Sequence, residues 1–487
     1  MNDRFPAELV ERKLLGLKLH SVPRSVGIHP AVLKFCASTL NVPLSLIYEK
    51  SMRSGVLPSD FKRTNITPIF KSGKKTDPSN YRPINLCSVP AKVMESIIKD
   101  EMIRHLTENE LIFSSQHGFL PGKSCTTNLL AYLNEVTASL DKGVPYDVVM
   151  IDYKKAFDTV PFKQMLQKLE AHGVMGEVLR WLTNWTEDRK QRVVLNGICS
   201  GWTDVLSSVV QGSVLGPVLF IVFINDIDLV ITDPSTKMFK YADDSKFGRP
   251  ISTPADALTL QAQIDSVWQW STRWGMTIHP LKTVVLHFGY GNPRYQYTKN
   301  GCMISDVSSV RDLGVIVDES CSPSLHVQTI TKKANGVLSQ LDRTLISRNQ
   351  RVVTGLFKTF VRPVLESAVS AWSPWQKQDI NAIERIQRRA TRMIPGIGTL
   401  EYEDRLKVCN MTTLEQRRRR GDMIEVYKMI NGFTSAVNKD FLCFTSQRHN
   451  LVTRSVENKF LVSEKCRLDV RKNFFSNRVV NCWNSLP

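Results

Sequence analysis

Two adjacent carboxylates, Asp243 and Asp244, lie between two short runs in which apolar and polar residues alternate, 237–241 and 245–247. Such alternation predicts two strands joined by a turn that carries the carboxylates. Neighbouring carboxylates repel each other, so keeping them together calls for a compensating positive charge. Hard cations such as Mg²⁺, which take oxygen ligands, supply that charge. The alternative interpretation is an ordinary surface turn that happens to contain two Asp residues.

A third carboxylate, Asp152, follows an apolar, β-branched run over residues 146–151. This run predicts a buried strand that places Asp152 at its C-terminal end, beside the turn with Asp243 and Asp244. Three carboxylates from neighbouring strands can hold two Mg²⁺ ions about 3.5–4 Å apart, the spacing that enzymes use for phosphoryl transfer. These three residues are therefore the candidate catalytic and metal-binding set.

The overall charge favours a polyanionic partner. The 487 residues carry a formal net charge of +18, and nucleic acid is the first candidate for a chain this basic. A solvated basic surface is the alternative.

None of the ten cysteines belongs to a Cys-x-x-Cys pair, which argues against zinc ribbons and favours reduced core cysteines. The longest apolar run, 214–224, contains Gly216 and Pro217 and is too short to span a bilayer, so no membrane partner is predicted.

Two basic residues in the segment 55–90 are candidates for binding phosphate. Arg82 can clamp a triphosphate bidentately with its rigid guanidinium, and Lys71 can reach the same phosphates. Solvated loop cations are the alternative for both. The segment contains five prolines and predicts loops and short strands. The run 66–70 predicts an edge strand, because Pro68 cannot donate a hydrogen bond to a neighbouring strand.

Three further residues are candidates for contacting a nucleotide. Phe157 comes five residues after Asp152, where a bulky ring would exclude a ribose 2′-hydroxyl; a core aromatic is the alternative. Gln211 lies in a glycine-rich turn before an apolar run that predicts a buried helix, and its amide can bond the base or sugar. Lys282 follows an amphipathic helix and can act as a general acid toward pyrophosphate, or be a surface lysine.

The remaining periodicity predicts a largely helical chain around these short strands. Basic helical stretches at 384–392 and 415–420 suit contact with a phosphate backbone without sequence readout. We divide the chain into an N-terminal helical extension, a central region with the candidate site, a mainly helical region and a C-terminal segment. These regions are 1–54, 55–290, 291–435 and 436–487. Helices are expected over 92–107, 158–169 and 178–184, within 248–278, and through most of 325–435.

The order of these signals along one chain resembles a reverse transcriptase, and more narrowly the polymerase of jockey-like non-LTR retrotransposons. The resemblance extends over roughly 25–487 and includes a segment, 312–315, that is similar to the family's primer grip. The other matching segments are 80–86, 116–119, 152–158, 211–217, 361–366, 383–389 and 482–487.

The resemblance implies an α+β, right-hand polymerase fold with fingers, a palm made of an antiparallel sheet with helices, and a helical thumb. It implies two Mg²⁺ ions on Asp152, Asp243 and Asp244. An RNA template, a DNA primer or target and dNTPs are the implied partners, and a retrotransposon ribonucleoprotein in the nucleus and cytoplasm is the implied location. The oligomeric state is not predicted.

The resemblance also gives each remaining candidate a role. Lys71 and Arg82 would hold the triphosphate, and Phe157 would be the steric gate that selects deoxynucleotides. Gln211 would contact the incoming nucleotide, and Lys282 occupies the position of the proton donor. Two residues depart from the family pattern: His279 replaces a usual Asn, and Gly216 replaces a frequent Ser.

The predicted activity is RNA-directed DNA polymerisation. A catalytically silent nucleic-acid-binding remnant is the alternative, because relatives carry an endonuclease domain that this sequence lacks, as a fragment or degraded copy would. An RNA-directed RNA polymerase is a third interpretation. Phe157 argues against it, because an RNA polymerase needs room for the 2′-hydroxyl.

Overall fold

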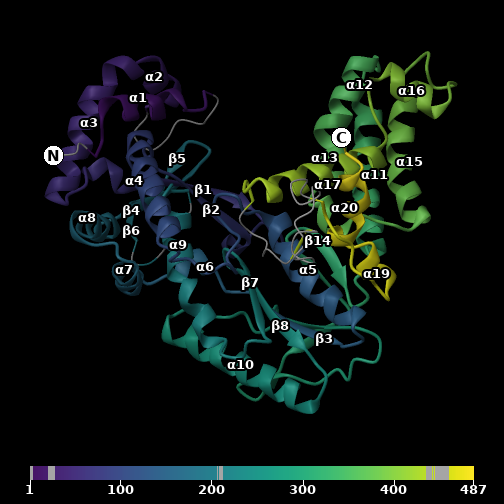
Figure 1. Ribbon diagram of the computed structural model, residues 1–487. Coiled ribbons are helices and arrows are strands. Elements are labelled where there is room, and N and C mark those ends of the chain that lie inside the picture. Colours follow the sequence, from purple (N-terminus) through teal and green to yellow (C-terminus); the bar gives the residue numbers. More distant parts are fainter. Residues whose placement is uncertain are drawn as a thin grey trace. The chain divides into compact units, whose positions relative to one another are not determined.

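The computed structural model shows two compact units, each built from separate segments of the chain (Figure 1). The first unit comprises Met1–Phe119, Asp152–Val230 and Ser266–His279, and the second comprises Leu120–Ile151, Ile231–Asp265 and Pro280–Pro487. The residues described are 4–19, 28–205, 207, 212–434, 441, 442, 444 and 460–486. The four-part division made from the sequence stays a prediction.

The first unit contains a mixed sheet of short strands in the order β2-β1-β4-β5, with β6 also paired to β4. Strand β1 pairs antiparallel with β2 and parallel with β4, so the predicted edge position of this strand is wrong. Pro68 is accommodated because β4 pairs only with Arg63–Ile66, which leaves the half of β1 containing Pro68 with a single partner strand. The strands are β1 (Arg63–Phe70), β2 (Tyr81–Leu86), β4 (Lys190–Leu195), β5 (Ile198–Cys199) and β6 (Thr203–Asp204).

Helix α9 packs against α4 and α7 in the first unit, and its eight residues are all buried except Pro217. The helix expected over 158–169 is instead two helices, because Val160 is extended and Pro161 interrupts the hydrogen-bond ladder. The α-helices are α1 (Ala7–Leu15), α2 (Pro30–Phe35), α3 (Ala37–Ser54), α4 (Val89–Glu108), α6 (Ala156–Thr159), α7 (Phe162–Ala171), α8 (Gly176–Thr186) and α9 (Gly216–Phe223). The 3₁₀ turns are η1 (Ser59–Phe61), η2 (Pro78–Asn80) and η3 (Asn225–Val230).

The second unit contains a five-stranded sheet in the order β12-β9-β3-β8-β7. Strand β3 is central, pairs antiparallel with β8 and β9, and has five of its six residues buried. Helix α5 (Cys125–Asp141) packs against β3 and β7, and begins with a capping box between Ser124 and Thr127. The sheet strands are β3 (Tyr146–Ile151), β7 (Lys237–Tyr241), β8 (Asp244–Pro250), β9 (Val284–Phe288) and β12 (Ser305–Val307).

Two small hairpins and one long helix complete the region around this sheet. Helix α10 (Pro254–Arg273) runs from the second unit into the first and is the long helix expected within 248–278. One hairpin pairs β13 with β14, and the other pairs β10 with β11. These strands are β10 (Thr298–Lys299), β11 (Cys302–Met303), β13 (Ser309–Asp312) and β14 (Val315–Asp318).

From Ser324 to Ile430 the second unit is mainly helical, as predicted for 325–435, and two further helices follow among the described residues. Helices α11 and α15 pack against each other, and α17 packs against α20 (Figure 1). A π-helical turn, η4, joins α12 to α13. The elements are α11 (Ser324–Thr344), α12 (Gln350–Leu356), η4 (Phe357–Val361), α13 (Arg362–Glu366), α14 (Val369–Trp372), α15 (Lys377–Arg392), α16 (Tyr402–Val408), α17 (Leu414–Ile430), α19 (Asp469–Lys472) and α20 (Phe475–Asn484).

Candidate active site

The predicted carboxylate turn is present in the second unit. Strands β7 and β8 form an antiparallel hairpin in which Tyr241 pairs with Asp244, so Ala242 and Asp243 are the two turn residues. Ala242 is buried and has φ = 56°, a region where L-residues are disfavoured and glycine is usual. Asp243 is half-buried and Asp244 is exposed. Backbone strain at a buried residue that directly precedes two carboxylates is typical of a functional position.

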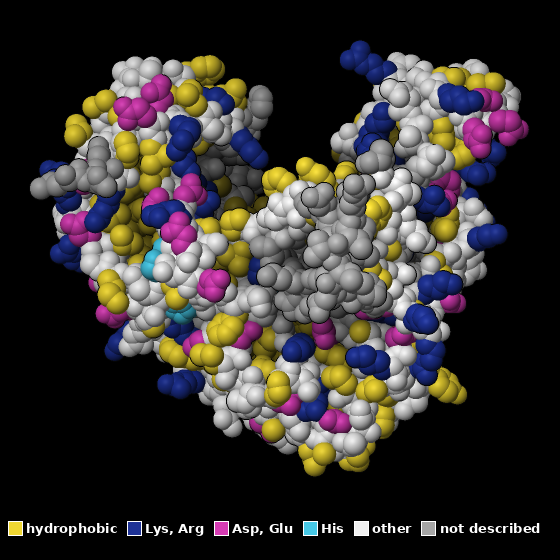
Figure 2. Space-filling view, viewed as in Figure 1, with side chains coloured by type: hydrophobic (Ala, Val, Ile, Leu, Met, Phe, Trp, Pro, Cys, Tyr) yellow, Lys and Arg dark blue, Asp and Glu magenta, His cyan; other side chains and the backbone are white. Residues whose placement is uncertain are grey.

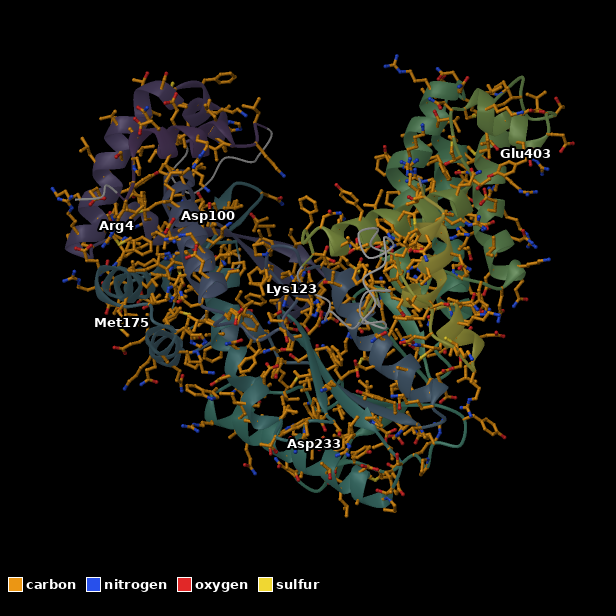
Figure 3. All side chains as sticks on the ribbon, in the orientation of Figure 1. Arg4, Asp100, Lys123, Met175, Asp233 and Glu403 are labelled. Carbon is orange, nitrogen blue, oxygen red and sulfur yellow. The ribbon has the colours of Figure 1, made fainter. Side chains whose placement is uncertain are left out.

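Strand β8 is anchored at its far end by charged groups. Arg249 lies 2.5 Å from Asp256 and 3.3 Å from Asp233, which is labelled in Figure 3. The Arg249 side chain is only 9% exposed, so these ion pairs are shielded from salt more than surface pairs are. The anchor holds β8 in place and, with it, the turn that precedes it.

Asp152 follows the end of a buried strand, as predicted. Strand β3 ends at Ile151, which pairs with Ser245 of β8, and Asp152 is the next residue of the chain. Within the first unit, the Asp152 carbonyl accepts a hydrogen bond of 2.7 Å from the His279 amide. Tyr153 also forms a β-bridge with Ile278. The backbone around Asp152 is therefore fixed, and His279 takes part in this bond through its amide rather than its side chain.

The sequence predicts that Asp152, Asp243 and Asp244 bind metal ions. Across the described ranges, no group of three or more His, Cys, Asp or Glu side chains is arranged to hold a metal ion. The donor chemistry of the three candidates still fits Mg²⁺, since carboxylate oxygens are its usual protein ligands. In nucleic-acid enzymes, substrate phosphates often supply the remaining ligands of such Mg²⁺ sites. The metal-binding roles of these three carboxylates stay predictions.

Phe157 lies in the short helix α6 and contacts two other aromatic rings of the first unit. It stacks on Phe220 of α9, with ring centroids 4.3 Å apart and planes inclined by 22°. The Phe119 ring meets it edge-on at 6.3 Å. Phe157 is half-buried and Phe119 is 45% exposed. The ring is thus held by a core residue while part of it stays accessible, which is compatible with both interpretations made from the sequence.

The two predicted phosphate-binding residues lie at the same end of the β1–β2 hairpin. Arg82 pairs with Ile69, and Lys71 follows β1 directly, with its amide bonded to the Asn80 carbonyl at 2.9 Å. Both side chains are exposed. The loop between them is stabilised internally, for example by a 2.9 Å bond from the Tyr81 hydroxyl to the Lys75 carbonyl. The hairpin brings the two cations together, as a shared phosphate site requires.

Gln211 lies outside the described residues, but the turn that follows it is described. Gly212 has φ = 117°, and a Cβ there would lie 2.4 Å from the carbonyl oxygen of Asn85, so only glycine fits. Glu95 of α4 accepts hydrogen bonds from the Val214 amide at 2.7 Å and from the Trp185 indole at 2.9 Å. Sequence reasoning missed Glu95, although a lone acid on a buried helix face is a usable signal.

Lys282, the predicted proton donor, lies in the turn that leads into β9 of the second unit, and its side chain is exposed. Exposure leaves it accessible to a ligand. The proton-donor role of Lys282 stays a prediction.

The basic stretches are only partly available for binding phosphate. Figure 2 shows Lys and Arg side chains over much of the visible face. In α15, Arg385 and Arg389 are exposed, as predicted. In α17, however, Arg417 pairs with Glu366, and Arg418 is buried, which lowers the pKa of its guanidinium. About half of the 417–420 run therefore serves packing rather than binding.

No helix in the described part of the chain is long and apolar enough to cross a bilayer.

Comparison with known families identifies the class. The family model described as "Reverse transcriptase (RNA-dependent DNA polymerase)" matches residues 73–317, which is half of the chain and includes every candidate site residue except Lys71. The chain therefore belongs to the reverse transcriptase family.

Comparison with curated proteins narrows the class to jockey-like non-LTR retrotransposons and confirms the resemblance seen in the sequence. The chain is 26% identical, over 84% of its length and 47% of the relative's, to the probable RNA-directed DNA polymerase from transposon BS of Drosophila melanogaster. It is 25% identical, over 83% of its length and 46% of the relative's, to the RNA-directed DNA polymerase from mobile element jockey of Drosophila funebris. The chain spans about half the length of these relatives.

Proposed function

We propose that this chain is an RNA-directed DNA polymerase that adds deoxynucleotides to a primer 3′-hydroxyl on an RNA template. The observation that carries the proposal is the β7–β8 turn with Asp243 and Asp244, beside the central strand β3, in a chain of the reverse transcriptase family. In this proposal the strands form the palm of a right-hand polymerase, the β1–β2 region belongs to the fingers, and the helices from α11 onward form the thumb.

The three carboxylates Asp152, Asp243 and Asp244 are proposed to hold two Mg²⁺ ions. When bound, such ions lower the pKa of the primer hydroxyl and stabilise the leaving pyrophosphate. The chain's own contribution is positional: strand pairing sets Asp243 and Asp244, and the backbone bond from His279 sets Asp152. Positioning and charge neutralisation supply most of the acceleration in phosphoryl transfer. Rigid strands are therefore suitable for holding the catalytic carboxylates in place.

The remaining candidates are proposed to select and orient the nucleotide. Arg82 and Lys71 would hold its triphosphate from one hairpin end, and Gln211 would contact its base or sugar. Phe157, supported by stacking on Phe220, would exclude the 2′-hydroxyl. Lys282 would donate the proton to pyrophosphate. The exposed arginines of α15 would contact template or primer phosphates, which makes binding salt-dependent. A retrotransposon ribonucleoprotein in the nucleus and cytoplasm is the proposed setting.

Primer extension tests the proposal. Wild-type chain, RNA template, DNA primer, dNTPs and Mg²⁺ are combined and compared with the double variant Asp243→Asn/Asp244→Asn. Asp404→Asn, an exposed carboxylate in α16, is the matched control. Extension by the wild type and the control, but not by the double variant, supports the polymerase. Salt-dependent RNA binding without extension by any chain would favour the silent remnant.

The gate is tested separately with Phe157→Ala. Removing a half-buried ring leaves room for the 2′-hydroxyl, so we expect incorporation of ribonucleotides relative to deoxynucleotides to rise about tenfold or more, from roughly 1.4 kcal/mol of lost discrimination. Phe360→Ala, which truncates an exposed ring in η4, is the control. An unchanged ratio would make Phe157 a core aromatic.

A further inference from the structure

A buried ion pair connects the β13–β14 hairpin to strand β8 within the second unit. Lys246 of β8 pairs with the carboxylate of Asp312, the last residue of β13 before its turn. Their side chains are only 5% and 7% exposed. The Lys246 ammonium also lies 4.5 Å from the centroid of the Tyr132 ring in α5. The strands of this hairpin pair with each other in a separate two-stranded sheet, so the contact joins two sheets through side chains.

A buried ion pair at this position has a high desolvation cost. Taking two charges out of water costs several kcal/mol per ion, and apolar residues of similar volume often give equal or better stability. Tyr132 does not share the charge: burial and the nearby Asp312 carboxylate raise the pKa of its phenol, which stays neutral. Unlike apolar packing, a charge-assisted hydrogen bond has a defined geometry. The Lys246 ammonium therefore fixes the position of the Asp312 carboxylate.

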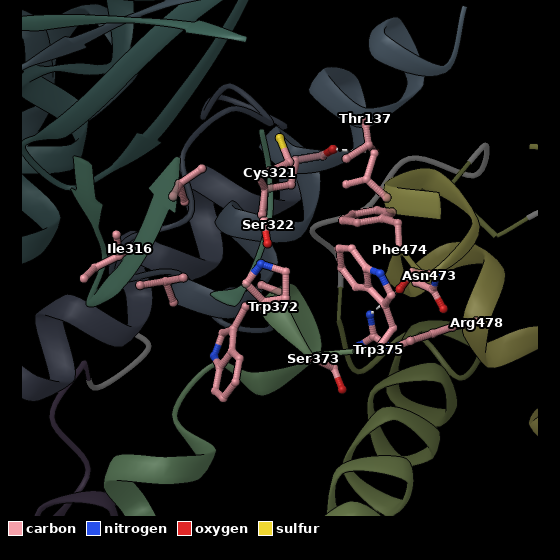
Figure 4. A pocket seen from close by; sticks show the side chains of 16 residues that line it. Thr137, Ile316, Cys321, Ser322, Trp372, Ser373, Trp375, Asn473, Phe474 and Arg478 are labelled. Carbon is pink, nitrogen blue, oxygen red and sulfur yellow. Dashed lines mark hydrogen bonds between the residues drawn. The ribbon is translucent and has the colours of Figure 1, made fainter. Parts of the chain in front are cut away.

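Apolar packing holds the β14 side of the hairpin, because Val315 and Val317 are buried in the main core of the second unit. Val315 and Val317 of β14 border a cavity of about 40 Å³, also lined by Trp372 and Phe474 (Figure 4). A cavity of this size holds about one or two waters. Side chains that border it lose dispersion contacts on that side. On β13, by contrast, Asp312 is the buried residue, so the ion pair is the directional contact that holds this strand.

The position of Lys246 on β8 shows what the bond aligns. Lys246 comes two residues after Asp244, so both side chains leave β8 on the same face. One short rigid strand therefore connects a candidate catalytic carboxylate with the ion pair beneath the β13–β14 turn. That turn belongs to the segment that resembles a primer grip.

We propose that Lys246 and Asp312 are positioning residues that set the β13–β14 turn relative to the start of β8, and thereby place a primer terminus for reaction. This inference rests on the proposed polymerase function. The physical coupling that it requires can be measured without any activity.

The test uses Lys246→Met/Asp312→Leu, which removes both charges at similar volume, because Asp312→Asn alone would leave a buried unpaired lysine and can unfold the chain. The matched control is Glu319→Gln, which removes an exposed pair with Arg294 just after β14. In thermal unfolding, we expect the double variant to unfold within a few degrees of wild type. The second measurement is hydrogen exchange of the backbone amides. The amides of the double variant in 309–318 should nevertheless exchange at least tenfold faster, with β3 and β9 unchanged. Unchanged exchange in 309–318 would overturn the coupling.

Primer extension then decides the positioning role. We expect the double variant to extend a paired primer at least tenfold more slowly, with the KM for dNTP within twofold of wild type and Glu319→Gln unaffected. Faster exchange combined with wild-type extension would overturn the positioning role. Failure of the wild type itself to extend would instead overturn the proposed function, and the exchange result would still decide whether the pair couples the two elements.

Discussion

The β7–β8 and β13–β14 hairpins of the second unit each join antiparallel strands through a two-residue turn. In β13–β14, Leu313 and Gly314 both have positive φ, the conformation that matches strand twist, and glycine takes the more extreme value of 90°. In β7–β8, Ala242 has positive φ without glycine, is buried, and precedes two carboxylates. The β13–β14 turn has glycine at one of its two positive-φ positions, whereas the β7–β8 turn has no glycine where chemistry is proposed.

The two hairpins also differ in the contacts that hold them in place. Strand β8 is an inner strand of the five-stranded sheet, between β3 and β7, so backbone hydrogen bonds hold the strand that follows the carboxylate turn along both of its edges. The β13–β14 hairpin depends on side chains: Val315 and Val317 pack in the core, Lys246 pairs with Asp312, and the His326 Nδ1 accepts a 3.1 Å bond from the Ile316 amide. A turn held by backbone pairing tolerates strain, whereas a hairpin held by side chains is sensitive to charge and pH.

The largest expected effect separates the two carboxylates of the strained turn. Asp243→Asn should reduce the extension rate about 10³-fold or more, roughly 4 kcal/mol of transition-state stabilisation, because it removes a charged metal ligand from the turn itself. Asp244→Asn, at an exposed strand position, should cost about tenfold to a hundredfold. Both variants should unfold at the wild-type temperature. Equal losses would show that the two carboxylates act as one unit.

The next effect tests the strain at Ala242. Ala242→Val places a β-branched residue at φ = 56° in a buried position, and should reduce the free energy of unfolding by about 3 kcal/mol through backbone strain and overpacking. Urea unfolding measures it, with Ala242→Gly as the control that relieves the strain. A tolerated valine would remove the contrast between the two turns.

The pH dependence tests the side-chain support of β13–β14. Burial, with the charge of Arg311, lowers the pKa of His326 from 6.5 to about 4. Between these values the unfolded chain binds more protons than the native one, so stability falls as the pH falls from 6.5 toward 4. The loss due to this ring should reach about 2 kcal/mol between pH 7 and pH 5. Urea unfolding of wild type and His326→Gln at both pH values isolates it, because other groups cancel in the difference. A constant difference would contradict the prediction.

The smallest effect belongs to the regular turn. Gly314 has φ = 90° and open space where the methyl group of an alanine would lie, so Gly314→Ala meets backbone strain and no clash. We expect a loss of about 1 kcal/mol in unfolding free energy. Thermal unfolding measures it, and Gly355→Ala, at a helical position with open space, should be neutral or stabilising. A loss as large as that of Ala242→Val would mean that both turns are equally constrained.

Local pattern was sufficient for much of the fold and for the order of candidate residues. Alternation predicted the strands on either side of Asp243, and the apolar run predicted the buried β3 ending before Asp152. Strong periodicity predicted α4, α10 and the helical region after α11. These features depend on neighbouring residues, whose spacing directly determines which face of an element is apolar. The family resemblance depended on the order of short motifs, which is also a property of the sequence.

Only the tertiary structure decided which residues serve packing and which stay accessible. Glu95 bonds the Val214 amide across 119 residues, and Lys246 pairs with Asp312 across 66. Strand β1 gained a second neighbour in β4, and Arg418 was drawn into the core. Partners so far apart in the chain leave no periodicity in the local sequence, because their pairing depends on how separately formed elements pack. The sequence alone therefore determined the elements and the candidate chemistry, while packing determined the supports that hold them.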